Sequence, residues 1–103
     1  MTKLLKLKRG VILAGLHIKM TPALKAADKI WESYGQDLVV TGGLDGAHSA
    51  GSLHYCGRAL DLRIWGFSSL EIIDIAQNLK ATLGDDYDVV THKTHIHVEY
   101  DPK

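Results

Sequence analysis

Two short segments in which apolar and polar residues alternate constrain the fold of this chain more than any other feature. In residues 58–64 every second residue is a large apolar one, so Asp61 falls on the opposite, polar face. Residues 95–100 alternate in the same way and place His95, His97 and Glu99 together on one face. The sequence therefore predicts two strands of one sheet that share a core on one side. Asp61 and His97 then face a common cleft on the other side.

A loop rich in glycine and serine leads into the first of these strands and carries a histidine. Residues 42–51 are expected to form this loop at the rim of the cleft. His54 follows it, and Gly57 can supply the turn before the strand, because glycine enters backbone regions closed to other residues. Imidazole and carboxylate both suit zinc, and catalytic zinc sites usually keep three protein ligands and one open position. We expect His54, Asp61 and His97 to bind one zinc ion, with the fourth position left to water.

The spacing S-x-H-x-x-G-x-A-x-D, followed by a C-terminal H-x-H, resembles that of a group of zinc peptidases. The group includes D-Ala-D-Ala carboxypeptidases, phage L-alanyl-D-glutamate peptidases and lysostaphin-type enzymes, and the zinc domain of hedgehog signalling proteins is similar too. The resemblance runs from about Thr21 to Tyr100, and the fixed letters of the first motif are Ser52, His54, Gly57, Ala59 and Asp61. It implies that His54, Asp61 and His97 are the ligands and that His95 is a catalytic or transition-state-stabilising residue.

The chain departs from these families where several relatives carry carboxylates. Thr94 stands where some have a Glu or Asp three residues before the last ligand, and Thr91 stands where hedgehog-type relatives have a Glu. The assignment of the general base therefore rests on His95 alone. The sequence also offers no match for the arginine with which some carboxypeptidases hold a C-terminal carboxylate, which favours an endopeptidase.

The resemblance implies a small zinc metallopeptidase of the phage or prophage type. Its substrate would be a peptidoglycan stem peptide, hydrolysed through a zinc-activated water by a D,D-carboxypeptidase or an L-Ala-D-Glu-type endopeptidase. His48, Ser52 and Thr41 are expected to bind substrate or to support the ligands, although His48 could equally be an exposed loop residue. Two alternatives stay open: a catalytically inactive zinc module that binds a cell-wall or protein partner, and a structural zinc site completed by Cys56 or His48.

Length and composition predict one folded domain over residues 1–103, since 46% of the residues are apolar. Cys56 is the only cysteine, so no intrachain disulfide is possible. The 12 basic and 12 acidic residues cancel, which argues against a nucleic-acid partner bound through bulk charge. No apolar run approaches the about 20 residues that cross a bilayer, and no cleavage site follows the short apolar run near the N-terminus.

From these features we expect a monomer without membrane insertion. It would be made in the cytoplasm without a signal peptide, and it would act on the cell wall after release or as a virion-associated protein.

The remaining patterns predict an α+β fold. We expect a small antiparallel sheet with two main helices packed on one side and the zinc cleft on the open face, as in the hedgehog and D-Ala-D-Ala peptidase domains that the motifs resemble. Further strands are expected at residues 37–41 and 89–91, and residues 3–8 form a short edge strand or an extended arm. Residues 11–16 form either a strand or a turn.

Local signals mark the ends of both helices. The first helix is expected to begin with Thr21 as its N-cap and to end at Gly35. The second is expected to begin with a capping box formed by Ser68 and Glu71 and to end at Gly84. Its predicted buried residues are Ile72, Ile73, Ala76, Leu79 and Leu83.

Overall fold

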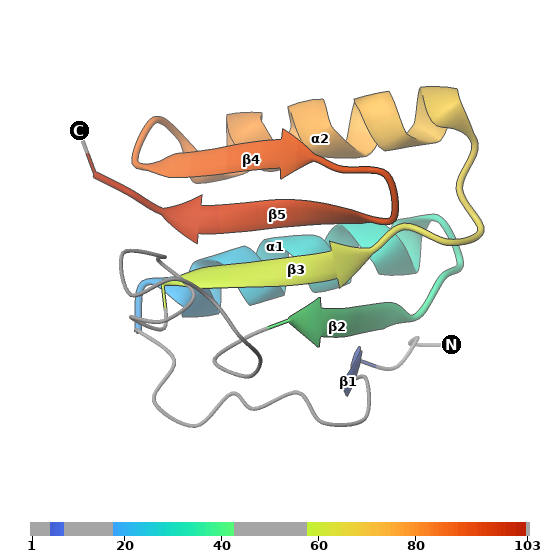
Figure 1. The fold of residues 1–103 in the computed structure, drawn as a ribbon, viewed down its shortest axis with the longest axis horizontal. Helices are drawn as coiled ribbons and strands as arrows, with labels where there is room; N and C mark the ends of the chain where they lie inside the picture. The colour runs from blue at the N-terminus through green and yellow to red at the C-terminus, as the bar shows by residue number, and fades with distance from the viewer. Residues whose placement is uncertain (1–4, 8–17, 43–57, 103) are drawn as a thin grey trace.

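In a computed structural model that describes residues 5–7, 18–42 and 58–102, five strands form one layer of the protein and two helices form the other (Figure 1). Both helices cover the same face of the sheet, and neither covers the opposite face. The predicted α+β fold, with an antiparallel sheet and two helices on one side, is confirmed. In chain order the elements are β1 (Leu5–Leu7), α1 (Met20–Ser33), β2 (Leu38–Gly42), β3 (Ala59–Arg63), α2 (Ser69–Leu83), β4 (Tyr87–Thr91) and β5 (His95–Tyr100).

The strand order is β1-β2-β3-β5-β4, so β3 lies at the centre of the sheet. Strands β2, β3, β5 and β4 pair antiparallel with their neighbours, whereas the short β1 pairs parallel with β2 at the edge. The edge strand predicted within residues 3–8 is confirmed. Residues 11–16 lie outside the described residues. In the part of the chain that the structure describes, neither helix has the length and apolar character needed to cross a membrane.

The core lies between the helices and the sheet, and the alternation along the strands decides which residues enter it. Leu60 and Leu62 of β3 and Ile96 and Val98 of β5 are at most 1% exposed. Burying such a side chain contributes about 1.5–3 kcal/mol. A shift of the strand register by one residue would turn these side chains to solvent. The hydrophobic core therefore fixes the pairing of β3 with β5, and it sends the intervening polar residues to the uncovered face.

Helix α1 begins earlier than its sequence signal indicates. The N-cap position is Lys19, which makes no side-chain cap, and Thr21 lies inside the first turn. The prediction of Thr21 as the N-cap is therefore wrong. Met20 is fully buried in the core, so tertiary packing starts the helix at this residue rather than at the capping residue. The predicted end is confirmed, because Gly35 follows the last turn with a φ of +71°.

Helix α2 begins and ends at the predicted residues. The Glu71 N–H donates to the Ser68 hydroxyl, and the Ser68 N–H donates to the Glu71 carboxylate, which completes the capping box. Gly84 follows the helix with a φ of +83°. The prediction that Ile73 is buried is wrong, because this side chain is 52% exposed. Ile75 takes the core position instead and lies on the stripe that contacts the sheet.

Candidate metal centre

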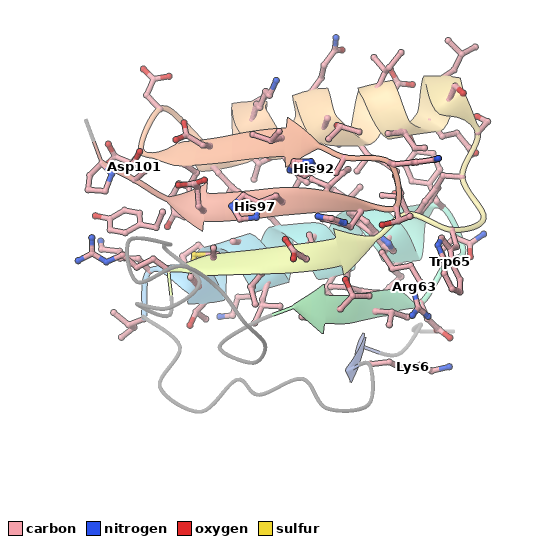
Figure 2. All side chains as sticks on the ribbon, in the orientation of Figure 1. Lys6, Arg63, Trp65, His92, His97 and Asp101 are labelled. Carbon is pink, nitrogen blue, oxygen red and sulfur yellow. The ribbon has the colours of Figure 1, made fainter. Side chains whose placement is uncertain are left out.

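Asp61 and His97 meet on the face of the sheet that the helices leave uncovered. They are direct partners in the register of β3 and β5, and His97 Nδ1 lies 2.9 Å from Asp61 Oδ1 (Figure 2). His95 joins them, with its Nε2 3.6 Å from the same carboxylate oxygen. The side chains of Asp61 and His97 are each 18% exposed, so water screens their interaction only in part. The structure thus brings together Asp61, His95 and His97, as the alternation of the two strands predicted.

Glu99 makes a second contact to His97 that the sequence did not reveal. His97 Nε2 lies 3.0 Å from Glu99 Oε1, so the ring stands between two carboxylates. A neutral imidazole has one N–H and can donate to only one of them. Both contacts are satisfied when the ring is doubly protonated, or when Nε2–H donates to Glu99 and Nδ1 shares a cation with Asp61. The alternation of residues 95–100 predicted Glu99 on the same face as His97, but it did not predict the contact with the ring.

The two carboxylates also set the charge of the ring. The hydrogen bond to Asp61 raises the pKa of His97, burial of the ring opposes this, and the charge of Asp61 together with Glu99 adds to the rise. The folded protein therefore stabilises a positive charge at this point. The charge can be carried by a proton on the ring or by a metal ion.

The donor atoms of Asp61 and His97 are of kinds that metal ions accept. Imidazole nitrogen and carboxylate oxygen are zinc ligands, and a ligating histidine usually donates its other ring N–H to a carboxylate that orients it. Asp61 and His97 offer one donor of each kind, and Glu99 contacts the other ring nitrogen of His97.

The carboxylate of Asp61 lies against β2 at a residue that has no side chain. Gly42 opposes Asp61 at an irregularity in the β2–β3 register, and a Cβ on Gly42 would lie only 2.6 Å from Asp61 Oδ2. Glycine is needed here because the carboxylate occupies the space that a side chain would take. The neighbouring Thr41, predicted to support the site, has its hydroxyl 3.5 Å from the backbone carbonyl of Asp61.

Three side chains from the β4–β5 turn pack together beside Asp61. The rings of His92 and His95 stack with centroids 4.8 Å apart, and the rings of His92 and His97 lie nearly perpendicular with centroids 6.2 Å apart. Thr94 Oγ1 lies 3.2 Å from His95 Nδ1. His92 is exposed. Its ring nevertheless stacks on one face of the His95 ring.

A pocket of about 310 Å³ opens next to Asp61. It is lined by Thr41, Asp61, Arg63, Trp65, Thr94 and His95. A larger pocket of about 630 Å³ lies beside β4 and the end of α2, and its described lining residues include no histidine. The smaller pocket is the better candidate for chemistry because two of the predicted site residues, Asp61 and His95, line it.

Glu99 also belongs to a group of three acidic residues, together with Asp88 and Asp101. Asp88 pairs with Glu99 across β4 and β5, and Asp101 follows β5. Carboxylate oxygens of these three residues lie within 4.8 Å of one another and could hold a metal ion. The sequence did not indicate this group, because it depends on the pairing of β4 with β5.

Several predicted site residues fall outside the described residues. His54, the predicted third ligand, lies in the range 43–57, as do His48, Ser52 and Cys56. Their roles stay predictions.

No protein-family model matches this sequence, and no curated protein matches it. The chemistry of the site is therefore inferred from its own residues.

Proposed function

We propose that this protein is a zinc peptidase that hydrolyses peptide bonds in peptidoglycan stem peptides. The observation that carries the proposal is the ring of His97, held between Asp61 and Glu99 with His95 beside them in an open pocket. Asp61 and His97 would hold the ion, with His54 as the third ligand. The resemblance of the two motifs to zinc peptidases of the cell wall supports the choice of substrate.

When bound, zinc would act as a Lewis acid on the scissile carbonyl and supply an activated water. The protein's own contribution is to place and orient the groups around that ion. Glu99 holds the ring of His97 so that Nδ1 faces Asp61. Gly42 leaves room for the Asp61 carboxylate.

His95 is the residue placed to move a proton. When its Nδ1–H donates to the Thr94 hydroxyl, Nε2 becomes the basic nitrogen, and this atom faces the pocket beside Asp61. Thr94 thereby has a function at the position where several peptidases carry a carboxylate. Its hydroxyl orients the histidine and leaves the proton transfer to the imidazole.

The alternative is a zinc-binding module without hydrolytic activity. It is favoured by Thr91 and Thr94, which are both exposed and offer no carboxylate base. In that case the pocket would bind a cell-wall peptide or a protein partner and release it unchanged. In either case we propose a monomer that reaches the wall after release from the cytoplasm or as part of a virion.

The experiment that tests the proposal combines metal analysis of the full chain with digestion of purified peptidoglycan. The products are identified by mass spectrometry, which reports the bond that is cut. We expect His97→Ala to lose tight zinc binding and hydrolysis, and His95→Ala to keep zinc and lose hydrolysis. Lys93→Ala, an exposed substitution in the same turn, is the matched control and should keep both.

Two results would contradict the proposal. A protein that takes up no zinc cannot be the proposed peptidase. Unchanged cleavage by His95→Ala would remove this residue from the mechanism. If His95→Ala and the unchanged protein bind zinc equally and neither cleaves peptidoglycan, the binding module is the correct function.

A further inference from the structure

A cation lines the pocket beside the candidate metal centre. Arg63 lies two residues after Asp61 on β3 and therefore on the same face of the sheet. It is the register partner of His95 on β5, and both residues line the pocket of about 310 Å³. The cationic group therefore shares a cavity with the proposed proton-transfer residue.

The backbone of Arg63 is held on both sides. The indole N–H of the buried Trp31 donates to the Arg63 carbonyl oxygen at 3.2 Å, which ties the end of β3 to α1. The N–H of the next residue, Ile64, donates to the Thr94 carbonyl at 3.3 Å. The position of the arginine is thus anchored to the core and to the β4–β5 turn.

The side chain of Arg63 is held by an exposed tryptophan. Its guanidinium carbon lies 4.0 Å from the centroid of the Trp65 ring, and Figure 2 shows the two side chains next to each other at the end of β3. Trp65 is 65% exposed and adds little to the core. The turn that carries it requires Gly66, whose φ is +90° and whose Cβ, if present, would lie 3.2 Å from the Gln36 side chain.

Within the described segments, no carboxylate pairs with Arg63. The ion pairs found there join Lys6 to Asp37 and the two site histidines to Asp61 and Glu99. The carboxylate of Asp61 is already engaged by His97. A guanidinium in a pocket, stacked on one face and without an acidic partner among the described residues, can offer N–H groups to an anion from outside.

We propose that Arg63 and Trp65 form a subsite for a carboxylate of the substrate, next to the bond that is cut. Guanidinium matches carboxylate through two parallel hydrogen bonds, and stacking on the indole leaves that edge of the guanidinium accessible. The location of the cut bond rests on the proposed function, whereas the affinity for a carboxylate does not.

The spacing limits which carboxylate the subsite reaches. Residues two apart on a strand are separated by about 6.6 Å, so Arg63 lies about that far from Asp61 along β3. An extended peptide spans about 3.3–3.6 Å per residue. The carboxylate therefore belongs to a residue within one or two positions of the cut bond, and it is either a free C-terminal carboxylate or an acidic side chain. A terminal carboxylate would make the enzyme a carboxypeptidase.

The experiment measures binding, so it does not depend on hydrolysis. Three probes are titrated into the ¹⁵N-labelled full chain: N-acetyl-D-alanine, its C-terminal amide, and N-acetylglutamate with only the C-terminus amidated. The chain has two tryptophans, so the exposed indole N–H of Trp65 reports binding and that of the buried Trp31 serves as an internal reference. We expect at least one carboxylate probe to bind about tenfold more tightly than the amide, as a charged hydrogen-bond partner allows.

The two acids identify the source of the carboxylate. Preference for N-acetyl-D-alanine indicates a free C-terminus, and preference for the glutamate probe indicates a side chain. If all three probes bind alike, the proposal is wrong.

A second arginine, Arg58, directly precedes β3 and provides the matched control. The Arg58 guanidinium carbon lies 5.9 Å from the Tyr100 ring centroid, at the other end of β3 and outside the pocket. We expect Arg63→Gln to abolish the preference for acid over amide, Arg63→Lys to retain part of it, and Arg58→Gln to leave it unchanged. Equal losses in Arg63→Gln and Arg58→Gln would show a general charge effect and overturn the proposal. If the unchanged protein prefers the acid probes but does not hydrolyse peptidoglycan, the proposed peptidase function is wrong. The proposed carboxylate subsite is then still supported.

Discussion

The two faces of β3 and β5 are made by alternate residues of the same strands, yet different forces hold them. The covered face is stabilised by the removal of apolar surface from water, with Leu62 and Ile96 at most 1% exposed. The other face is held by a few polar contacts of 2.9–3.6 Å around Asp61 and His97. Apolar burial tolerates small shifts in geometry, whereas these contacts do not. The sheet thus separates the face that stabilises the fold from the face that carries the polar cluster proposed to bind an ion.

The largest expected effect is a loss of stability caused by a substitution on the covered face. We expect Leu62→Ala to lower the free energy of unfolding by about 2–5 kcal/mol, because it removes a fully buried side chain and leaves a cavity. Urea denaturation followed by circular dichroism measures the loss. Arg63→Gln, the next residue on the opposite face, is the control and should cost less than about 1 kcal/mol. Equal costs would mean that the two faces are not separable.

Removing a proposed ligand tests the uncovered face. We expect Asp61→Ala to lower zinc affinity by more than about 100-fold, beyond the 10- to 100-fold cost of losing a group that only orients a ligand. Titration of zinc against a competing chelator gives the affinity, and urea denaturation of the same variant gives its stability. The separation of the faces holds if the zinc affinity falls far more than the stability. Retention of full zinc affinity would exclude Asp61 as a ligand.

Two acidic substitutions sharpen the location of the ion. We expect Glu99→Gln to weaken zinc binding by about 10–100-fold, because Gln orients the ring of His97 less strongly. Asp88→Asn should leave zinc binding unchanged, since Asp88 belongs only to the acidic group next to Glu99. If Asp88→Asn weakens binding as much as Glu99→Gln does, the ion lies among the carboxylates and not at His97. The measurement is the same chelator competition.

The smallest expected effect concerns pH. The folded pKa of His97 is raised by Asp61, so the protonated ring stabilises the zinc-free protein below the unfolded pKa of about 6.5. That contribution is lost as the pH rises through the higher folded pKa. Zinc must displace the proton, so its affinity should rise over the same range. NMR titration of the His97 ring, with zinc titrations at several pH values, checks both; a zinc affinity independent of pH would contradict the assignment.

The features that could be predicted from the sequence are those with a local cause. Alternation with a period of two depends only on neighbouring residues, and it correctly placed Asp61 and His97 on one face. The capping box of Ser68 and Glu71 is equally local and is confirmed. The fold class followed from these local signals together with the resemblance of the motifs.

The features that the sequence did not reveal depend on contacts between distant segments. Helix α1 begins at Met20 because that side chain reaches the core, which a search for capping residues cannot detect. Ile73 was expected in the core, but Ile75 is buried there instead, because packing on the sheet fixes the rotation of α2 about its axis. The contact of Glu99 with His97, and the stacking of Arg63 on Trp65, depend on side-chain direction and on a turn.

Gly42 has a consequence for anyone who wishes to transplant this site. It contributes no functional group, yet an added methyl at this residue would fall 2.6 Å from Asp61 Oδ2 and force the carboxylate or β2 to shift. A designer who grafts only the ion-binding residues onto another scaffold would therefore build a misaligned copy. Any transplanted copy of the site must therefore include Gly42, which contributes only the space that the carboxylate occupies.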